Sequence, residues 1–216
     1  MVSKVDPDPK YRFVLAKLLA VMQLTLRGTP FIYQGQELGM INKDFKSIDQ
    51  LRDVESINLY SELTNSMSEP EAFRKILAGS RDHSRTPMQW SGSDYAGFSD
   101  AEPWIGTDDD YKICNVEDQL KDEGSVLNFY RSLIRIRKAH PALVYGDIEI
   151  TNKKVADLFT YYRRNEKQTL FIECNLSRNT IRRKGSVPSA TRLISNYPDT
   201  DRRWLRPYEA TVWRMV

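Results

Sequence analysis

Two arginines and an aspartate lie close together in the middle of the chain, and their side chains could recognise a sugar. Arg81, Asp82 and Arg85 are followed by Met88 and Trp90, which are apolar. A planar guanidinium group donates several hydrogen bonds in a fixed fork, so it can bind hydroxyl groups or hold a catalytic carboxylate. The same residues could instead form ion pairs that only fix a loop. The residues alone leave both interpretations open.

Carboxylates that could act as a general acid or base occur at two places. Asp53 and Glu55 fall in a helical pattern, and residues 108–110 are consecutive aspartates. A general acid needs a raised pKa in a desolvated pocket, and nothing in the sequence indicates one. Asp53 and Glu55 are typical of a solvated helix face. Glu37 is typical of a residue that caps the segment after a tight turn.

The first forty residues predict one helix-to-strand step of a parallel sheet. Apolar residues recur at helical spacing between residues 11 and 26, and Gly28 ends that helix. The apolar run 31–33 lies between Pro30 and Gly35, which suits a buried strand. Barrel active sites lie at the carboxyl ends of the strands, so the polar residues after this strand are candidates for a site.

The rest of the chain predicts long connections with helices and then a second domain. Helical patterns occur around 48–65 and 70–79, and a strongly amphipathic helix over 124–140 ends at Pro141. The segments beyond are short, β-rich and separated by turn residues, which is typical of a small antiparallel sheet. They are residues 145–150, 156–162, 169–173, 190–194 and 210–215. We therefore predict two domains, 1–140 and 141–216, with a boundary near residue 141.

Composition narrows the functional classes. The chain has 216 residues and a net charge of +3, and its basic pairs, such as 202–203, have no interleaved aromatics. We therefore expect no nucleic-acid partner. The two cysteines and two histidines are too scattered for a metal site or a disulfide framework, and we predict no metal and no cofactor. No run approaches the ~20 apolar residues of a membrane helix, so we expect no membrane partner and a cytoplasmic location.

Two motifs carry a family resemblance. Residues 81–90 read Arg-Asp-His-Ser-Arg-Thr-Pro-Met-Gln-Trp, and residues 28–40 read Gly-Thr-Pro-Phe-Ile-Tyr-Gln-Gly-Gln-Glu-Leu-Gly-Met. Together they resemble the second half of a glycoside hydrolase family 13 α-glucosidase, of the oligo-1,6-glucosidase and dextran glucosidase type. The resemblance implies an α/β plus β fold. The chain would comprise the C-terminal end of a (β/α)8 TIM barrel, with its last strand and helices, followed by a small antiparallel β-sandwich domain.

The resemblance also implies roles for three side chains. Arg81 matches the arginine that lines the pocket for the terminal glucose, which makes it the main expected substrate contact. Glu55 matches a glutamate that reaches the sugar on the leaving-group side of the scissile bond. Arg85 belongs to the same motif as Arg81 and is expected to bind substrate or to support the residues that do. The polar residues among 33–37 are implied to be scaffold.

The reaction that the resemblance implies is retaining hydrolysis of a terminal α-1,6 or α-1,4 glucosidic bond, by two carboxylates about 5 Å apart. The family's nucleophile, general acid and third carboxylate belong to earlier barrel strands, so we expect no catalytic residue in this chain. The expected partners are an isomalto- or malto-type oligosaccharide and an N-terminal half. We predict a fragment of an α-glucosidase. The alternative is a non-catalytic carbohydrate-binding or interaction protein built on the family scaffold.

Overall fold

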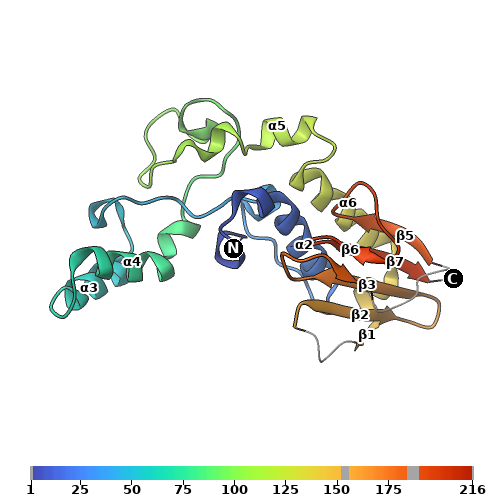
Figure 1. The fold of residues 1–216 in the computed structure, drawn as a ribbon. Coiled ribbons are helices and arrows are strands. Elements are labelled where there is room, and N and C mark those ends of the chain that lie inside the picture. The colour runs from blue at the N-terminus through green and yellow to red at the C-terminus, as the bar shows by residue number, and fades with distance from the viewer. Residues whose placement is uncertain (1, 152–155, 184–189, 216) are drawn as a thin grey trace. The chain divides into compact units, whose positions relative to one another are not determined.

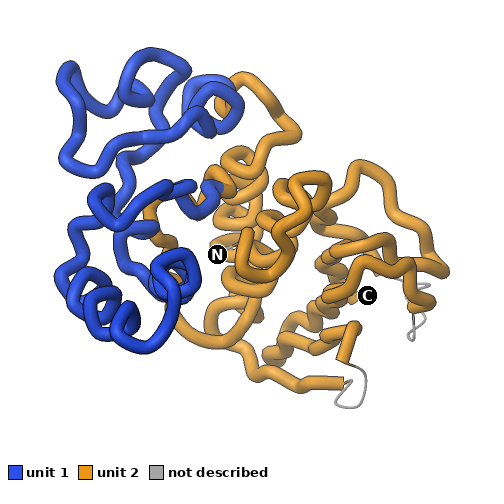
Figure 2. The backbone as a smooth tube through the Cα atoms, turned by 60° about the vertical axis from the view of Figure 1, so that its left-hand side comes forward, with its two compact units in different colours: residues 1, 40–118 blue, residues 2–39, 119–216 orange. Residues whose placement is uncertain are grey.

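The computed structural model describes residues 2–151, 156–183 and 190–215. The chain forms two compact units, which Figure 2 distinguishes by colour. Unit 1 comprises residues 40–118, and unit 2 combines residues 2–39 with 119–216. These units do not follow the boundary near residue 141, which remains a prediction about domains. None of the helices in the described ranges is long and apolar enough to cross a membrane.

Unit 2 contains a five-stranded antiparallel sheet (Figure 1), and every β-rich segment predicted from the sequence contributes one strand. The strands are β1 (Asp147–Ile150), β2 (Leu158–Arg164), β3 (Thr169–Asn175), β5 (Ala190–Ser195) and β7 (Ala210–Met215). They lie in the order β1-β2-β3-β7-β5. Phe171 of β3 lies opposite Tyr162 of β2 and Trp213 of β7, so three aromatic rings occupy one face of adjacent strands. A separate ladder pairs β4 (Ile181–Arg182) with β6 (Trp204–Leu205).

Two long helices complete the core of unit 2 and confirm both helix predictions there. Helix α2 (Arg12–Thr25) packs against α6 (Val126–Ala139) and against strands β3 and β7 (Figure 1). The Ser125 hydroxyl caps α6 by accepting the backbone N–H of Asn128 at 3.2 Å. His140 is extended, as the residue before a proline prefers to be, so α6 ends and the short α7 (Pro141–Tyr145) begins. The shared core includes Leu18, Val21, Leu24, Leu133, Tyr161, Ile172 and Val212.

A buried carboxylate joins the first residues to the β-rich part of unit 2. Helix α1 (Val2–Val5) is followed by Asp6, which accepts hydrogen bonds from Arg178 Nε at 2.7 Å and from the Tyr208 hydroxyl at 2.6 Å. The hydrogen bond from Arg178 holds the pKa of Asp6 well below its ordinary value, although burial opposes this shift. Asp6 is therefore a charged anchor in a buried position.

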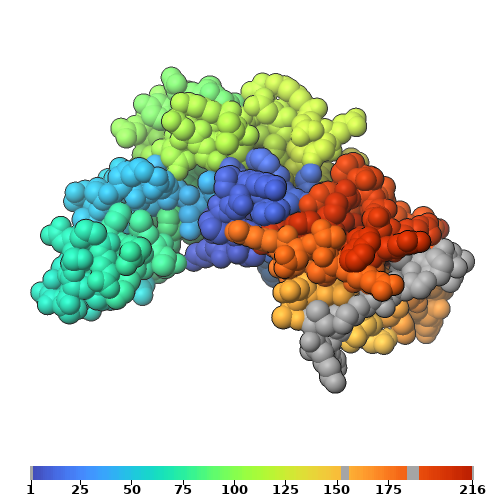
Figure 3. Space-filling model, in the orientation of Figure 1, coloured from blue at the N-terminus to red at the C-terminus, as the bar shows by residue number. Residues whose placement is uncertain are grey.

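Unit 1 has a small core and long connections. Helices α3 (Val54–Leu63) and α4 (Glu69–Gly79) pack together and form one lobe in the space-filling view (Figure 3). Pro70 in the first turn of α4 suits a helix start, because its missing N–H has no partner there in any case. The buried core consists of Phe45, Leu51, Ile76 and Ile105. Because these four side chains are separated in sequence, the connections between the helices are held in place by the same core.

Short helices make up the remaining described elements. Helix α5 (Val116–Lys121) lies where the chain returns from unit 1 to unit 2. The 3-10 helices are η1 (Pro9–Tyr11), η2 (Gln36–Leu38), η3 (Ile48–Gln50), η4 (Arg81–Ser84), η5 (Asp94–Gly97) and η6 (Asp109–Lys112).

The buried strand predicted at residues 31–33 is not formed. This segment has no regular secondary structure, Phe31 is 83% exposed, and Ile32 and Tyr33 are exposed too. A strand is held by hydrogen bonds to a neighbouring strand, and the described strands pair only among themselves. The prediction was wrong because an apolar run does not by itself supply a pairing partner.

Candidate functional site

Arg81 begins η4, which follows α4 after a single residue. That residue, Ser80, is the N-cap of η4, and its hydroxyl accepts the backbone N–H of Asp82 at 3.3 Å. The guanidinium of Arg81 reaches Asp53, directly before α3: Nε and Nη2 donate to Asp53 Oδ1 at 3.1 and 2.7 Å. The start of η4 and the start of α3 are thus joined through a charge-assisted pair.

The two partners of this pair differ in exposure. The side chain of Arg81 is 55% exposed, whereas that of Asp53 is 4% exposed. The hydrogen bond from Arg81 lowers the pKa of Asp53 to about 2, against the opposing effect of burial. The same bond raises the pKa of Arg81. Asp53 therefore stays ionised and acts as an acceptor beneath an arginine whose outer part remains open to a ligand.

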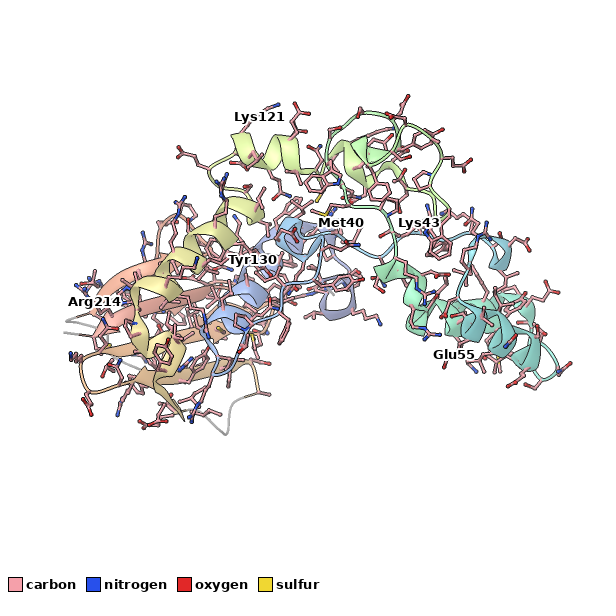
Figure 4. The ribbon with its side chains drawn as sticks, turned by 180° about the vertical axis from the view of Figure 1, so that it is seen from behind. Met40, Lys43, Glu55, Lys121, Tyr130 and Arg214 are labelled. Atoms are coloured by element: carbon pink, nitrogen blue, oxygen red, sulfur yellow. The ribbon has the colours of Figure 1, made fainter. Side chains whose placement is uncertain are left out.

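Glu55 joins the same cluster from the first turn of α3, where Figure 4 labels it. Its Oε2 lies 2.9 Å from Nη2 of Arg81, and its side chain is 78% exposed. The structure therefore brings together Arg81 and Glu55, the two side chains that the resemblance named as sugar contacts. An exposed donor and an exposed acceptor next to each other can bind hydroxyl groups of a sugar ligand.

Asp82 holds the backbone before α3 and the Arg85 side chain in place. Its side chain has no exposed surface, and its Oδ2 accepts the backbone N–H groups of Arg52 at 2.6 Å and of Asp53 at 2.9 Å. Its Oδ1 accepts Arg85 Nη1 at 3.0 Å. Arg85 also lies 3.7 Å from Asp53. Arg85 therefore belongs to the ion-pair network that supports the site.

The sequence missed the part that Asp53 plays. The sequence pattern around Asp53 suggested a solvated helix face. In the structure the Asp53 carboxylate is buried and binds Arg81, and its Oδ2 accepts the Ser56 hydroxyl at 2.8 Å. The prediction was wrong for Asp53, because its partner lies in a distant part of the sequence. Aspartate is a preferred N-cap residue, so an aspartate near the start of a helical pattern is a local hint that it precedes the helix.

A second group of polar residues lies in unit 2, between η2 and α6. Burial raises the pKa of Glu37, whose Oε2 has no hydrogen-bond partner among the described residues. Burial, together with the nearby Glu37, raises the pKa of Tyr130, which Figure 4 labels on α6. Gln36 Nε2 donates to Gln23 Oε1 at 2.7 Å, which ties η2 to α2. Nowhere in the described ranges do three or more His, Cys, Asp or Glu side chains gather as metal ligands.

A strained turn lies just after the motif that contains Arg81. Tyr95 and Ala96 have positive φ angles of 50° and 61° and precede Gly97 at 64°. Non-glycine residues adopt this left-handed conformation at a cost of roughly 1 kcal/mol or more each. The carbonyl of Ala96 accepts the backbone N–H groups of Trp90 at 2.8 Å and of Ser91 at 3.0 Å. These hydrogen bonds fix the end of the motif.

Comparisons with known proteins identify the family. The family model for the alpha-amylase catalytic domain matches residues 1–146. An oligo-1,6-glucosidase of Halalkalibacterium halodurans is 37% identical, and a trehalose-6-phosphate hydrolase of Escherichia coli (strain K12) is 41% identical. The crystal structure of trehalose-6-phosphate hydrolase from Bacillus licheniformis superimposes with a TM-score of 0.92 at 36% identity. Each comparison covers 99% of this chain but only 40% of the relative. The chain belongs to the alpha-amylase family, glycoside hydrolase family 13.

Proposed function

We propose that the chain is the C-terminal part of an α-glucosidase that hydrolyses terminal α-1,6 or α-1,4 bonds of isomalto- or malto-type oligosaccharides with retention of configuration. The observation that carries this proposal is the cluster in which Asp53 holds Arg81 beside Glu55. The match of the alpha-amylase catalytic domain to residues 1–146 supports residues 1–140 as the end of a (β/α)8 barrel, followed by a β domain over 141–216. The hydrolases among the relatives support the reaction class.

In this proposal Arg81 binds the terminal glucose. Its Nε and Nη2 are held by Asp53 and Glu55, while Nη1 makes no hydrogen bond with any residue that the structure describes. Nη1 would donate to a sugar hydroxyl, and Glu55 would accept the proton of a hydroxyl across the scissile bond. Because Asp53 and Asp82 are already ordered, little side-chain entropy is lost when the sugar binds.

The catalytic nucleophile and general acid would come from residues outside this sequence. Asp53, with a pKa near 2, cannot donate a proton at neutral pH. Burial is the largest cause of the raised pKa of Glu37, and a buried carboxylate by itself is not the pair of carboxylates that a retaining mechanism needs. The partner we propose is therefore the N-terminal portion of a family member.

Complementation tests this proposal directly. Hydrolysis of p-nitrophenyl α-glucoside and of isomaltose is measured for the chain alone, and for the chain mixed with the N-terminal portion of the Halalkalibacterium halodurans oligo-1,6-glucosidase. We expect turnover only in the mixture. Arg81→Ala should abolish it, while Arg74→Ala, an exposed arginine on α4, should leave it intact.

Three results contradict the proposal. Turnover by the chain alone would place the catalytic pair within these residues. Turnover that survives Arg81→Ala would remove the role of the cluster. Association of the two portions with isomaltose binding but no turnover would support the non-catalytic alternative. The compartment we propose is the cytoplasm, because Cys114 and Cys174 are buried and neither forms a disulfide.

A further inference from the structure

Unit 2 contains an open cleft of about 810 Å³, and none of the residues that line it belongs to the cluster around Arg81. It lies where α7 leads into β1 and where β2 turns into β3. One wall consists of Pro141 and residues 145–149, and the other consists of residues 164–168. Cavities of this size hold small-molecule ligands in many proteins.

The fold holds the two walls close together. A Cβ atom at Gly146 would lie 2.4 Å from the carbonyl oxygen of Ala142 and 2.5 Å from that of Arg164, so only glycine fits there. The buried Arg163 donates from Nη2 to the Gly146 carbonyl at 2.9 Å. In the opposite wall, Asn165 Oδ1 accepts the backbone N–H groups of residues 167 and 168 at 3.0 and 2.8 Å. The cleft is therefore preformed by backbone contacts.

The charges around the cleft are balanced. Asp147 pairs with Arg27 at 3.2 Å, and Glu149 pairs with Arg164 at 3.0 Å. Glu166 and Lys167 are exposed, and their side chains make no ion pair or hydrogen bond with the described residues. The lining holds three acidic and two basic groups, and Arg27 brings a third positive charge to Asp147, so the charges sum to zero and favour neither an anion nor a cation. Such a lining favours a neutral ligand that can both donate and accept hydrogen bonds.

Tyr145 adds an aromatic surface to this polar lining. It is 82% exposed although it is a large side chain at the end of a short helix. Such a ring can pack against the C–H face of a pyranose, while carboxylate, ammonium and amide groups beside it bind the hydroxyls. Among the described residues, Pro141 and Ile148 are the only apolar side chains that line the cleft besides Tyr145, too few for a lipid or a hydrophobic peptide.

We propose that this cleft is a second, non-catalytic site for a neutral oligosaccharide. Tyr145 stacks on one glucose unit, and Glu166 and Lys167 bind its hydroxyls. Only the choice of glucose rests on the proposed function, since the recognition chemistry comes from the cleft itself. The site would hold a longer α-glucan on unit 2 independently of Arg81.

Nuclear magnetic resonance of the isotope-labelled full chain tests the proposal with maltotriose and isomaltotriose. We expect saturable shifts of backbone amides in residues 145–149 and 164–168. Tyr145→Ala should weaken this binding about tenfold, because it removes the stacking surface. Phe31→Ala is the matched control, since Phe31 is 83% exposed in the same unit and does not line the cleft.

Arg81→Ala separates this proposal from the proposed function. It should remove any shifts near residues 52–56 and 80–85 and leave those of the cleft unchanged, so each site can fail without the other. No saturable shift in the cleft, or shifts that survive Tyr145→Ala with unchanged affinity, would overturn the second site. Binding of glucose 6-phosphate but not of maltotriose or isomaltotriose would also overturn it, because it would show an anion site.

Discussion

Asp82 accepts the backbone N–H of Asp53 at 2.9 Å, although 29 positions separate the two residues in the sequence. Asp53 in turn accepts the guanidinium of Arg81, which directly precedes Asp82. The neighbour of the arginine therefore positions the carboxylate that holds the arginine. The orientation of Arg81 depends on the tertiary fold of unit 1 and not on its own loop alone.

Removing the charge of Asp82 should destabilise unit 1. In Asp82→Asn an amide N–H₂ group replaces one carboxylate oxygen, so one of its donors, the Arg85 guanidinium or the N–H groups before α3, loses its acceptor. We expect the free energy of unfolding to fall by roughly 2 kcal/mol, the usual effect of losing a buried charge-assisted hydrogen bond. Urea denaturation checks this, with Asp109→Asn as the exposed control. Equal stability of the two variants would contradict it.

The cluster around Asp53 should weaken in acid. The pKa of Asp53 is about 2 in the folded chain, below its ordinary value near 4. Its contribution to stability is therefore complete above about pH 4 and is lost as the pH falls towards 2. The titration of the Asp53 carboxyl carbon, followed by nuclear magnetic resonance, measures this directly. A midpoint near 4 would mean that Arg81 does not hold this carboxylate in solution.

Arg183 should be essential for the β-rich part of unit 2. It lies between Glu173 and Glu209, all three side chains are almost fully buried, and Trp213 Nε1 donates to Glu173 at 3.0 Å. Arg183→Met would leave two buried carboxylates without their shared cation, which should cost about 3–5 kcal/mol.

The pH dependence of this variant identifies the cause. Burial already raises the pKa of Glu173, and loss of Arg183 should raise it further. A group whose folded pKa lies above its unfolded pKa stabilises the fold at low pH, so the variant should recover part of its stability near pH 5. Thermal unfolding at both pH values checks this. Arg182→Met, at the exposed neighbouring position, is the control and should show neither effect.

Gly146 should not tolerate a side chain. In Gly146→Ala the new Cβ would collide with two backbone oxygens, and backbone cannot move aside cheaply. We expect a loss of about 2 kcal/mol from overpacking. Gly92→Ala is the control, because no atom lies within 4 Å of its added Cβ. Denaturation curves with equal midpoints would show that α7 can shift away from β2.

Local signals made much of unit 2 predictable. The helical spacing of apolar residues in 11–26 and 124–140 involves only residues that are close in sequence, and so do the turn residues around each β segment. The structure forms α2, α6 and the five strands at these places. Pro141 correctly ended a helix, but it also begins α7, which the sequence analysis did not predict. At residues 31–33 the apolar run predicted a strand, but a strand forms only when another strand supplies hydrogen-bond partners, and the run itself contains no information about such a partner.

The site was predictable in its members but not in its connections. The motif pointed to Arg81, Asp82 and Arg85. Of the two interpretations that the sequence left open, the ion-pair network is the one that the structure shows for Asp82 and Arg85. Asp53 could not be assigned, because its acceptor role depends on a partner in another element. One sequence contains no signal for such a pair.

The two units differ in when they can fold during synthesis of the chain. Unit 1 is a continuous stretch, so all of it can fold as soon as it has left the ribosome. Unit 2 cannot, because α2 packs against β7 and the two lie at opposite ends of the chain. At about 5–20 residues per second, α2 emerges roughly 10–40 s before β7 is made. During that interval part of the apolar face of α2 stays uncovered, so a nascent chain exposes this face until β7 has been made.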